Sequence, residues 1–139
     1  MKLQPYVFFN GDAEAAAGFY RDALGAEITM LMRYRDCPET PDPAHMQPGN
    51  ADKIMHMSLR IGSTGDTVLM GADDCSGSSR GFAGFSLSLS VADAAEAEKA
   101  FAALADGGSV CVPLAPTFFS PAFGMLTDRF GVSWMIVVM

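Results

Sequence analysis

The chain repeats one order of predicted elements, and this repetition constrains its fold more than any other feature. In each half an apolar strand leads into a turn that contains an aspartate, Asp12 or Asp93, and an alanine-rich helix follows. Each helix carries an apolar stripe and runs into glycine, at Gly25 in the first half and at Gly107 in the second. Short strands then follow each helix. The sequence therefore predicts an α+β domain made of two tandem βαβββ modules.

The element boundaries follow from the same patterns. Helices are expected at 12–24 and 93–105, and the second has the clearer start because Glu96 completes a capping-box pattern with Asp93. A proline-rich stretch at 36–52 is expected to be a loop. Strands are expected at 3–9, 27–35, 54–61, 67–70, 85–91, 109–112, 122–127 and 134–138. One domain would thus cover residues 1–139, with module one at 1–72, a linker at 73–81 and module two at 82–139.

Composition excludes several classes of protein. Half of the residues are hydrophobic and 18% are charged, which argues against a disordered chain. The formal net charge of -7 argues against nucleic-acid binding, which needs a basic surface. No apolar run is long enough for a membrane span, and the three widely spaced cysteines favour reduced thiols over a disulfide framework or a zinc site. We therefore expect a cytoplasmic protein that binds neither membrane nor nucleic acid.

Several short sequence motifs point to one superfamily. They are PYVFFNG at 5–11, FY at 19–20 with LGAE at 24–27, IMHMSLRI at 54–61, TFF at 117–119, and FG at 123–124 leading into DRFGVSWMI at 128–136. Together with the duplicated modules, they resemble the vicinal-oxygen-chelate superfamily of glyoxalase and bleomycin-resistance proteins. The resemblance is closest to its PhnB-like branch, which carries a 3-demethylubiquinone-9 3-methyltransferase-type domain name. It implies that the modules form a cup of mixed sheet around a metal or small ligand, and that the chain forms a homodimer.

The resemblance also locates the positions where metal-dependent members of the superfamily carry metal ligands. These positions are occupied by Pro5, Met70, Ser86 and Met135, the register at Met70 being uncertain by one residue. A hard divalent cation prefers carboxylate or imidazole ligands, which none of these residues supplies. We therefore predict that the usual metal site is absent and that the protein has no cofactor. A divalent metal bound in an atypical way is the alternative.

His56 is the main candidate for catalysis. Strand alternation places it on one face with Ser58 and Arg60, opposite Met55, Met57 and Leu59. It can be interpreted as a hydrogen-bonded structural residue or as a ligand-facing general base, since histidine titrates near neutrality. A third interpretation makes it a metal ligand, with Glu27 and Asp73 as the carboxylates within possible reach.

Other catalytic signatures are weak. The turn at 10–12 has one glycine, so it lacks the Gly-rich turn of a Rossmann-type methyltransferase, and we interpret the methyltransferase label as inherited by name. No Gly-x-Ser-x-Gly nucleophile elbow is present. The DRFG sequence at 128–131 is interpreted as a turn between strands rather than a catalytic box.

Three functional hypotheses follow. The first is a metal-free protein that binds a small, largely apolar molecule in the cup. The second is an enzyme of the same superfamily, of lyase, dioxygenase or transferase type, that uses His56 or an unusually bound metal. The third is an interaction module whose cup is vestigial. The residues predicted to line the cup are Val7, Phe9, Met70, Ser86, Ser88, Phe118, Phe119 and Met135.

Overall fold

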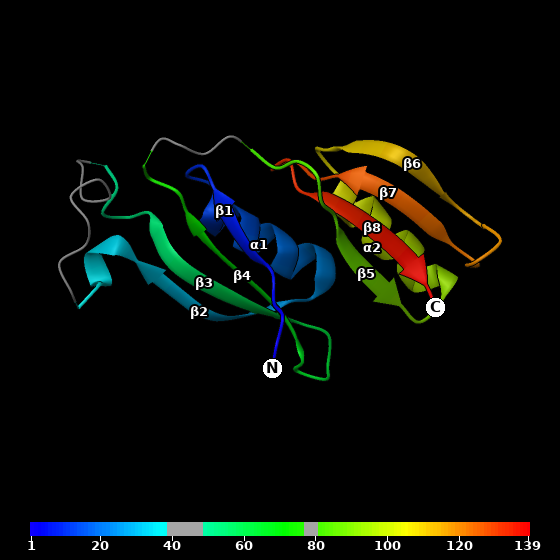
Figure 1. The fold of residues 1–139 in the computed structure, drawn as a ribbon, viewed down its shortest axis with the longest axis horizontal. Helices are drawn as coiled ribbons and strands as arrows, with labels where there is room; N and C mark the ends of the chain where they lie inside the picture. Colours follow the sequence, from blue (N-terminus) through cyan, green and yellow to red (C-terminus); the bar gives the residue numbers. More distant parts are fainter. Residues whose placement is uncertain (39–48, 77–80) are drawn as a thin grey trace. The chain divides into compact units, whose positions relative to one another are not determined.

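The computed structural model describes residues 1–38, 49–76 and 81–139, and its fold is drawn in Figure 1. The chain divides into two compact units, Met1–Gly81 and Phe82–Met139, each of which is described by itself. Within the described residues, each unit contains a four-stranded sheet and one α-helix (Figure 1). The α+β class and the two tandem βαβββ modules are therefore confirmed. Residues 39–48 of the predicted loop lie outside the described residues.

The first unit has its strands in the order β1-β4-β3-β2. Strand β1 pairs with β4 in parallel, whereas the β4–β3 and β3–β2 pairs are antiparallel. Its elements are β1 (Tyr6–Phe9), α1 (Ala13–Leu24), β2 (Glu27–Arg33), the short 3₁₀ helix η1 (Tyr34–Asp36), β3 (Ile54–Ile61) and β4 (Thr67–Asp73). Strand β4 ends three residues later than predicted because its last residues pair with β1, Phe9 lying opposite Asp73.

The second unit repeats this topology with the strand order β5-β8-β7-β6. Its parallel pair is β5–β8, and the other two pairs are antiparallel. Its elements are β5 (Leu87–Val91), α2 (Ala94–Ala105), β6 (Ser109–Ala115), β7 (Phe123–Thr127) and β8 (Ser133–Val138). The predicted turn at 128–131 is present: Asp128 accepts hydrogen bonds from the backbone N–H groups of Phe130 and Val132 and from the indole of Trp134.

Each core lies between the helix and one face of the sheet. In the first unit Tyr20 of α1 is fully buried, as are Met57 and Leu59 of β3. In the second unit Leu104 of α2 is buried and so is Ile136 of β8. Because only one face of each sheet packs against a helix, the opposite face carries the half-buried and exposed side chains. We call this opposite face the open face.

The helix starts differ from each other. In α2 the predicted capping box is confirmed: the Asp93 carboxylate accepts from the Glu96 backbone N–H at 2.8 Å, and the Glu96 carboxylate accepts from the Ala92 N–H at 3.0 Å. The position of Asp12 just before α1 also predicts a side-chain cap, and this prediction is wrong, because the Asp12 side chain accepts no capping hydrogen bond. The Ala13 N–H donates instead to the carboxylate of Asp73, at 2.9 Å.

Neither of the two α-helices in the described part of the chain is long and apolar enough to cross a membrane. All three cysteines, Cys37, Cys75 and Cys111, are free thiols.

Candidate functional site

The open face of the first unit is strongly aromatic where it is formed by β1. The side chains of Tyr6 and Phe8 are 39% and 55% exposed, whereas those of Val7 and Phe9 are 4% and 2% exposed. Val7 and Phe9, which the sequence placed in the ligand-binding cup, thus lie in the core and leave almost no surface for a ligand. Tyr6 and Phe8 occupy the ligand-accessible positions of this strand. Tyr6 lies opposite Met70 of β4, so the predicted residue Met70 shares the open face.

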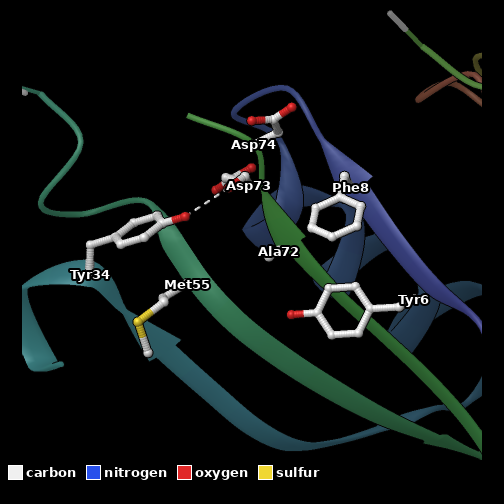
Figure 2. A pocket seen from close by; sticks show the side chains of 7 residues that line it. All are labelled: Tyr6, Phe8, Tyr34, Met55, Ala72, Asp73 and Asp74. Atoms are coloured by element: carbon white, nitrogen blue, oxygen red, sulfur yellow. Dashed lines mark hydrogen bonds between the residues drawn. The ribbon is translucent and has the colours of Figure 1, made fainter. Parts of the chain in front are cut away.

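A hollow of about 270 Å³ lies on this face. It is lined by Tyr6, Phe8, Tyr34, Met55, Ala72, Asp73 and Asp74, and we use "the hollow" for this set. In Figure 2 the rings of Tyr6 and Phe8 form one wall, and Tyr34 and Met55 form the wall across from them. The hollow is therefore an aromatic and thioether cleft with carboxylate residues at one end. Its position beside β1 and β3 makes it the candidate functional site.

Tyr34 is buried and hydrogen-bonded at the edge of the hollow. Its hydroxyl donates to the backbone carbonyl of Asp73 at 3.1 Å, as the dashed line in Figure 2 marks, and its side chain is buried. Burial, and after it negative charge at Cys75 and Asp73, raises the pKa of Tyr34 from 10.0 to about 12. The pKa of the neighbouring Cys75 thiol is also raised, mainly by burial and then by the charge of Asp73. Both groups therefore stay protonated near neutral pH.

Met55 reaches the hollow because of a β-bulge. In the β2–β3 pair, Met32 lies opposite His56 but Arg33 lies opposite Ile54, so Met55 is the extra residue of β3. The strict alternation that placed Met55 on the core face with Met57 is therefore wrong at this residue. Met57 and Leu59, beyond the bulge, are buried as predicted.

His56 lies on the open face, as predicted, next to the hollow. Its Nδ1 is 2.9 Å from the hydroxyl of Tyr6, and the two rings stack with their centroids 5.5 Å apart. The cation on the same face of β3, Arg60, pairs with Glu27 of β2. Burial raises the pKa of Tyr6, so its hydroxyl remains a neutral partner for the imidazole. The sequence did not single out Tyr6, although a tyrosine hydroxyl that needs a hydrogen-bond partner is a usable signal.

The open face of the second unit combines hydroxyls and thioethers. The Ser86 and Ser133 hydroxyl oxygens are 2.6 Å apart, and Ser88 lies opposite Met135, which in turn lies opposite Met125. The prediction that Ser86, Ser88 and Met135 share one face agrees with this register.

The predicted loop aromatics extend from this second sheet. The rings of Phe118 and Phe119 are 5.1 Å apart at their centroids, and Phe119 lies at the same distance from Phe123 of β7. Phe118 is fully exposed and Phe119 is 54% exposed. These rings therefore form an exposed apolar surface on the second unit.

The four positions that the superfamily resemblance assigns to metal ligands do not suit a hard cation. The Pro5 carbonyl accepts the Met70 N–H at 3.1 Å, and the Ser86 hydroxyl is engaged by Ser133. Met70 and Met135 offer thioethers, which favour soft metals. Among the described residues, no group of three or more His, Cys, Asp or Glu side chains is placed to hold a metal ion. Glu27 and Asp73 do not form a metal site with His56. Glu27 pairs with Arg60. The Asp73 carboxylate accepts hydrogen bonds from the N–H groups of Ala13 and Ile54.

Comparison with known proteins gives consistent matches over the whole chain. The model of a family described as 3-demethylubiquinone-9 3-methyltransferase matches residues 1–137. Protein YjdN of Escherichia coli is 32% identical over 145 residues, which cover 99% of this chain and 95% of that protein. The structure of protein PA1353 from Pseudomonas aeruginosa superposes with a TM-score of 0.85 at 42% identity, covering 99% of this chain and 97% of that one.

Two further structures connect the fold to a wider group. A PhnB protein from Bacillus cereus, also described as a 3-demethylubiquinone-9 3-methyltransferase, matches with a TM-score of 0.80 at 27% identity over the full length of both chains. A glyoxylase/bleomycin resistance protein/dioxygenase domain from Frankia matches with a TM-score of 0.70 at 13% identity, covering 99% of this chain and 96% of that one. At that identity the last match supports the fold alone. The resemblance to the PhnB-like branch, which was based on short sequence motifs, is thereby confirmed.

Proposed function

The chain belongs to the PhnB-like family described as 3-demethylubiquinone-9 3-methyltransferase, and on this basis we propose that it binds a small, largely apolar molecule without the superfamily's usual metal. The observation that carries the proposal is the hollow on the open face of the first unit, with Tyr6 and Phe8 in one wall. Ligand sites are typically concave and lined by apolar and aromatic side chains with a few polar groups.

The walls suit a flat molecule. Tyr6 and Phe8 lie 5.1 Å apart at their ring centroids, and both rings keep exposed surface. A ligand ring that covers this surface removes apolar area from water and gains ring contacts. Met55, in the wall across from them, can adapt its unbranched side chain to different ligand shapes. The volume of about 270 Å³ lies near the lower end of ligand pockets, which supports a small molecule.

The family description does not carry methyl transfer to this chain. The two sheets are mixed four-stranded sheets, each with one α-helix in the described residues, rather than a doubly wound parallel sheet. The metal-free part of the proposal is supported by the donor chemistry of Pro5, Met70, Ser86 and Met135.

The binding proposal is tested with 2-naphthalenemethanol, a neutral flat probe, and protein labelled with ¹³C at the methionine methyl groups. We expect the Met55 methyl resonance to shift on titration, while that of Met57, which is 0% exposed, stays in place. Phe8→Ala should weaken binding at least several-fold, whereas Phe85→Ala should not, although Phe85 is a similarly exposed ring. Failure of the probe to move Met55, or equal weakening by both variants, would contradict the proposal.

A second candidate function is supported by the contact between Tyr6 and His56. A neutral tyrosine hydroxyl 2.9 Å from an imidazole can pass a proton to or from a ligand, which is the arrangement an enzyme needs for acid–base chemistry. We propose His56 as the general base in that case. His56→Gln should then abolish turnover of a bound compound while leaving its affinity nearly unchanged. A variant that loses affinity and turnover together would assign His56 to binding.

Two properties stay proposals that follow from the resemblance and the composition. We propose that the chain forms a homodimer and works in the cytoplasm, where its three free thiols stay reduced. Sedimentation equilibrium at micromolar concentration should then give twice the chain mass of 14.7 kDa. A single species of 14.7 kDa would contradict the dimer.

A further inference from the structure

We propose that the flat molecule bound in the hollow carries a neutral hydrogen-bond acceptor, such as a carbonyl oxygen. The Nε2–H of His56 donates to this acceptor, and the Tyr6 hydroxyl keeps the proton of the imidazole on that nitrogen. The inference rests on the proposed function, because it assumes that the hollow binds a ligand. It adds a functional group to that ligand and makes Tyr6 a positioning residue as well as part of a wall.

His56 borders the hollow through its neighbours in the sheet. Along β3 it follows Met55, which lines one wall. Met57 lies opposite Gly71 of β4, so the next position along these antiparallel strands brings His56 beside Ala72, another residue of the hollow. A polar atom of the His56 side chain is therefore within reach of a molecule that fills the hollow.

One nitrogen of the imidazole is committed and the other is open. The Tyr6 hydroxyl lies 2.9 Å from Nδ1, and the two rings stack with an angle of 30° between their planes. Among the residues that the structure describes, Nε2 has no hydrogen-bond partner. In the same residues no buried side-chain nitrogen or oxygen lacks a partner, so Nε2 is accessible rather than buried. This nitrogen is available to a ligand.

The direction of the hydrogen bond between Tyr6 and His56 follows from the chemistry of the two groups. A phenol O–H is a stronger donor than an imidazole N–H, and an unprotonated ring nitrogen is a stronger acceptor than a phenol oxygen. Burial raises the pKa of Tyr6, so its hydroxyl keeps its hydrogen. No other acceptor for that hydrogen lies within the described part of the chain. The hydroxyl therefore donates to Nδ1, and the neutral imidazole carries its one proton on Nε2.

A donor at Nε2 selects an acceptor on the ligand. A ligand with a carbonyl oxygen gains a hydrogen bond, whereas a ligand with only apolar groups there leaves the N–H without a partner. The neighbouring groups on this face do not compete with His56 for the acceptor. Arg60 is paired with Glu27, and the residue opposite His56 on β2 is Met32, whose thioether has no hydrogen to donate.

The first test compares two uncharged probes of the same shape, 2-acetylnaphthalene and 2-isopropenylnaphthalene. They differ only in that a carbonyl oxygen replaces a methylene group. Each is titrated into the methionine-labelled protein with the Met55 methyl group as the reporter. We expect the ketone to bind about 3- to 10-fold more tightly, which is the range that one neutral hydrogen bond provides. His56→Leu should remove the difference, and His56→Gln should retain part of it, because the glutamine amide also has an N–H to donate.

The second test measures where the proton lies. The ¹⁵N chemical shifts of the imidazole report the tautomer at about pH 9, where a histidine is neutral. The chain has two histidines, so the spectrum of His56→Gln assigns the signals. We expect the Nε2–H form of His56 to dominate. Tyr6→Phe keeps the ring but removes the hydroxyl, so the Nδ1–H form should appear and the preference for the ketone should fall. Ser58→Ala, which removes a hydroxyl from the same face of β3, should change neither.

The outcomes separate this inference from the proposed function. A dominant Nδ1–H form would overturn the inference and favour the general-base candidate, which needs an Nε2 that can accept a proton. Equal binding of the two probes would also overturn it and leave the proposed function standing. Equal effects of Tyr6→Phe and Ser58→Ala would refute the positioning role of Tyr6. If neither probe moves the Met55 resonance, both proposals fail.

Discussion

Replacing Asp73 should show whether one buried carboxylate holds the first unit together. Asp73 is 2% exposed, and its two oxygens accept from the N–H of Ala13, the first residue of α1, and from the N–H of Ile54, the first residue of β3, each at 2.9 Å. One side chain thus joins the end of β4 to the starts of a helix and of the neighbouring strand. The cost of removing it follows from these two contacts.

Asp73→Ala leaves two buried N–H groups without their acceptor. Each such loss costs about 1–3 kcal/mol, so we expect the free energy of unfolding to fall by about 2–6 kcal/mol, less where water enters the space. Asp73→Asn should have an intermediate effect, because its amide has one acceptor oxygen, which can serve only one of the two N–H groups. Urea denaturation followed by far-ultraviolet circular dichroism measures the change. Hydrogen exchange at Ala13 and Ile54 locates it.

The matched control is Asp12→Ala. Asp12 occupies the conventional capping position of α1, but its side chain accepts no hydrogen bond there, so only its charge near the helix start is lost. That loss should cost less than about 1 kcal/mol. If Asp12→Ala destabilises the protein as much as Asp73→Ala, or if exchange at Ala13 and Ile54 is unchanged in the Asp73 variant, the assignment of the helix cap to Asp73 is refuted.

Three further predictions concern other parts of the molecule. Gly18→Ala should raise the free energy of unfolding by about 0.5–1 kcal/mol in urea denaturation, because alanine favours the helix. A Cβ at this position of α1 would meet nothing closer than the Arg21 side chain, at 3.8 Å. A fall in the free energy of unfolding would contradict this. The pKa of Tyr34 is raised from 10.0 to about 12, so the stability that its neutral hydroxyl contributes should be complete below pH 10 and lost as the pH rises through about 12. In Tyr34→Phe the free energy of unfolding should fall less steeply over that range. An identical dependence of the free energy of unfolding on pH in both proteins would contradict this. Protein purified without an affinity tag or chelator should contain well under one divalent metal ion per chain by elemental analysis; one ion per chain would reverse the order of the two proposed functions.

The fold could be predicted because its signals are local and occur twice. The alternation of leucine and serine at 87–90, the capping box at Asp93 and the left-handed Gly25 after α1 each specify a short stretch of backbone. The duplicated order then identified the two modules. What sequence patterns missed is non-local: the cap of α1 comes from Asp73, which is 60 residues away from Ala13 along the chain.

The two open faces differ in how well the sequence could predict them. In β5 the serines alternate with apolar residues, so the polar face of the strand was evident, and Ser88 was expected on the face of Met135, which lies opposite it in the sheet. In β1 the run YVFF is apolar at every position, so periodicity alone cannot distinguish its two faces. The side chain that breaks this symmetry is Tyr6, since its hydroxyl needs a polar partner and finds His56 on the open face.

The hollow itself depends on features that no single stretch of sequence encodes. Its residues come from β1, η1, β3 and β4, together with Asp74 just after β4, and one wall requires the bulge that brings Met55 to the open face. A bulge adds one residue to one strand, so only the pairing of β2 with β3 shows it. Once Met55 and Tyr34 stand across from Tyr6 and Phe8, the end of β4 with Asp73 and Asp74 closes the space between the two walls. The ligand binding that we propose therefore depends on strand pairing, and a substitution that removes the bulge should abolish binding even if every residue that lines the hollow is kept.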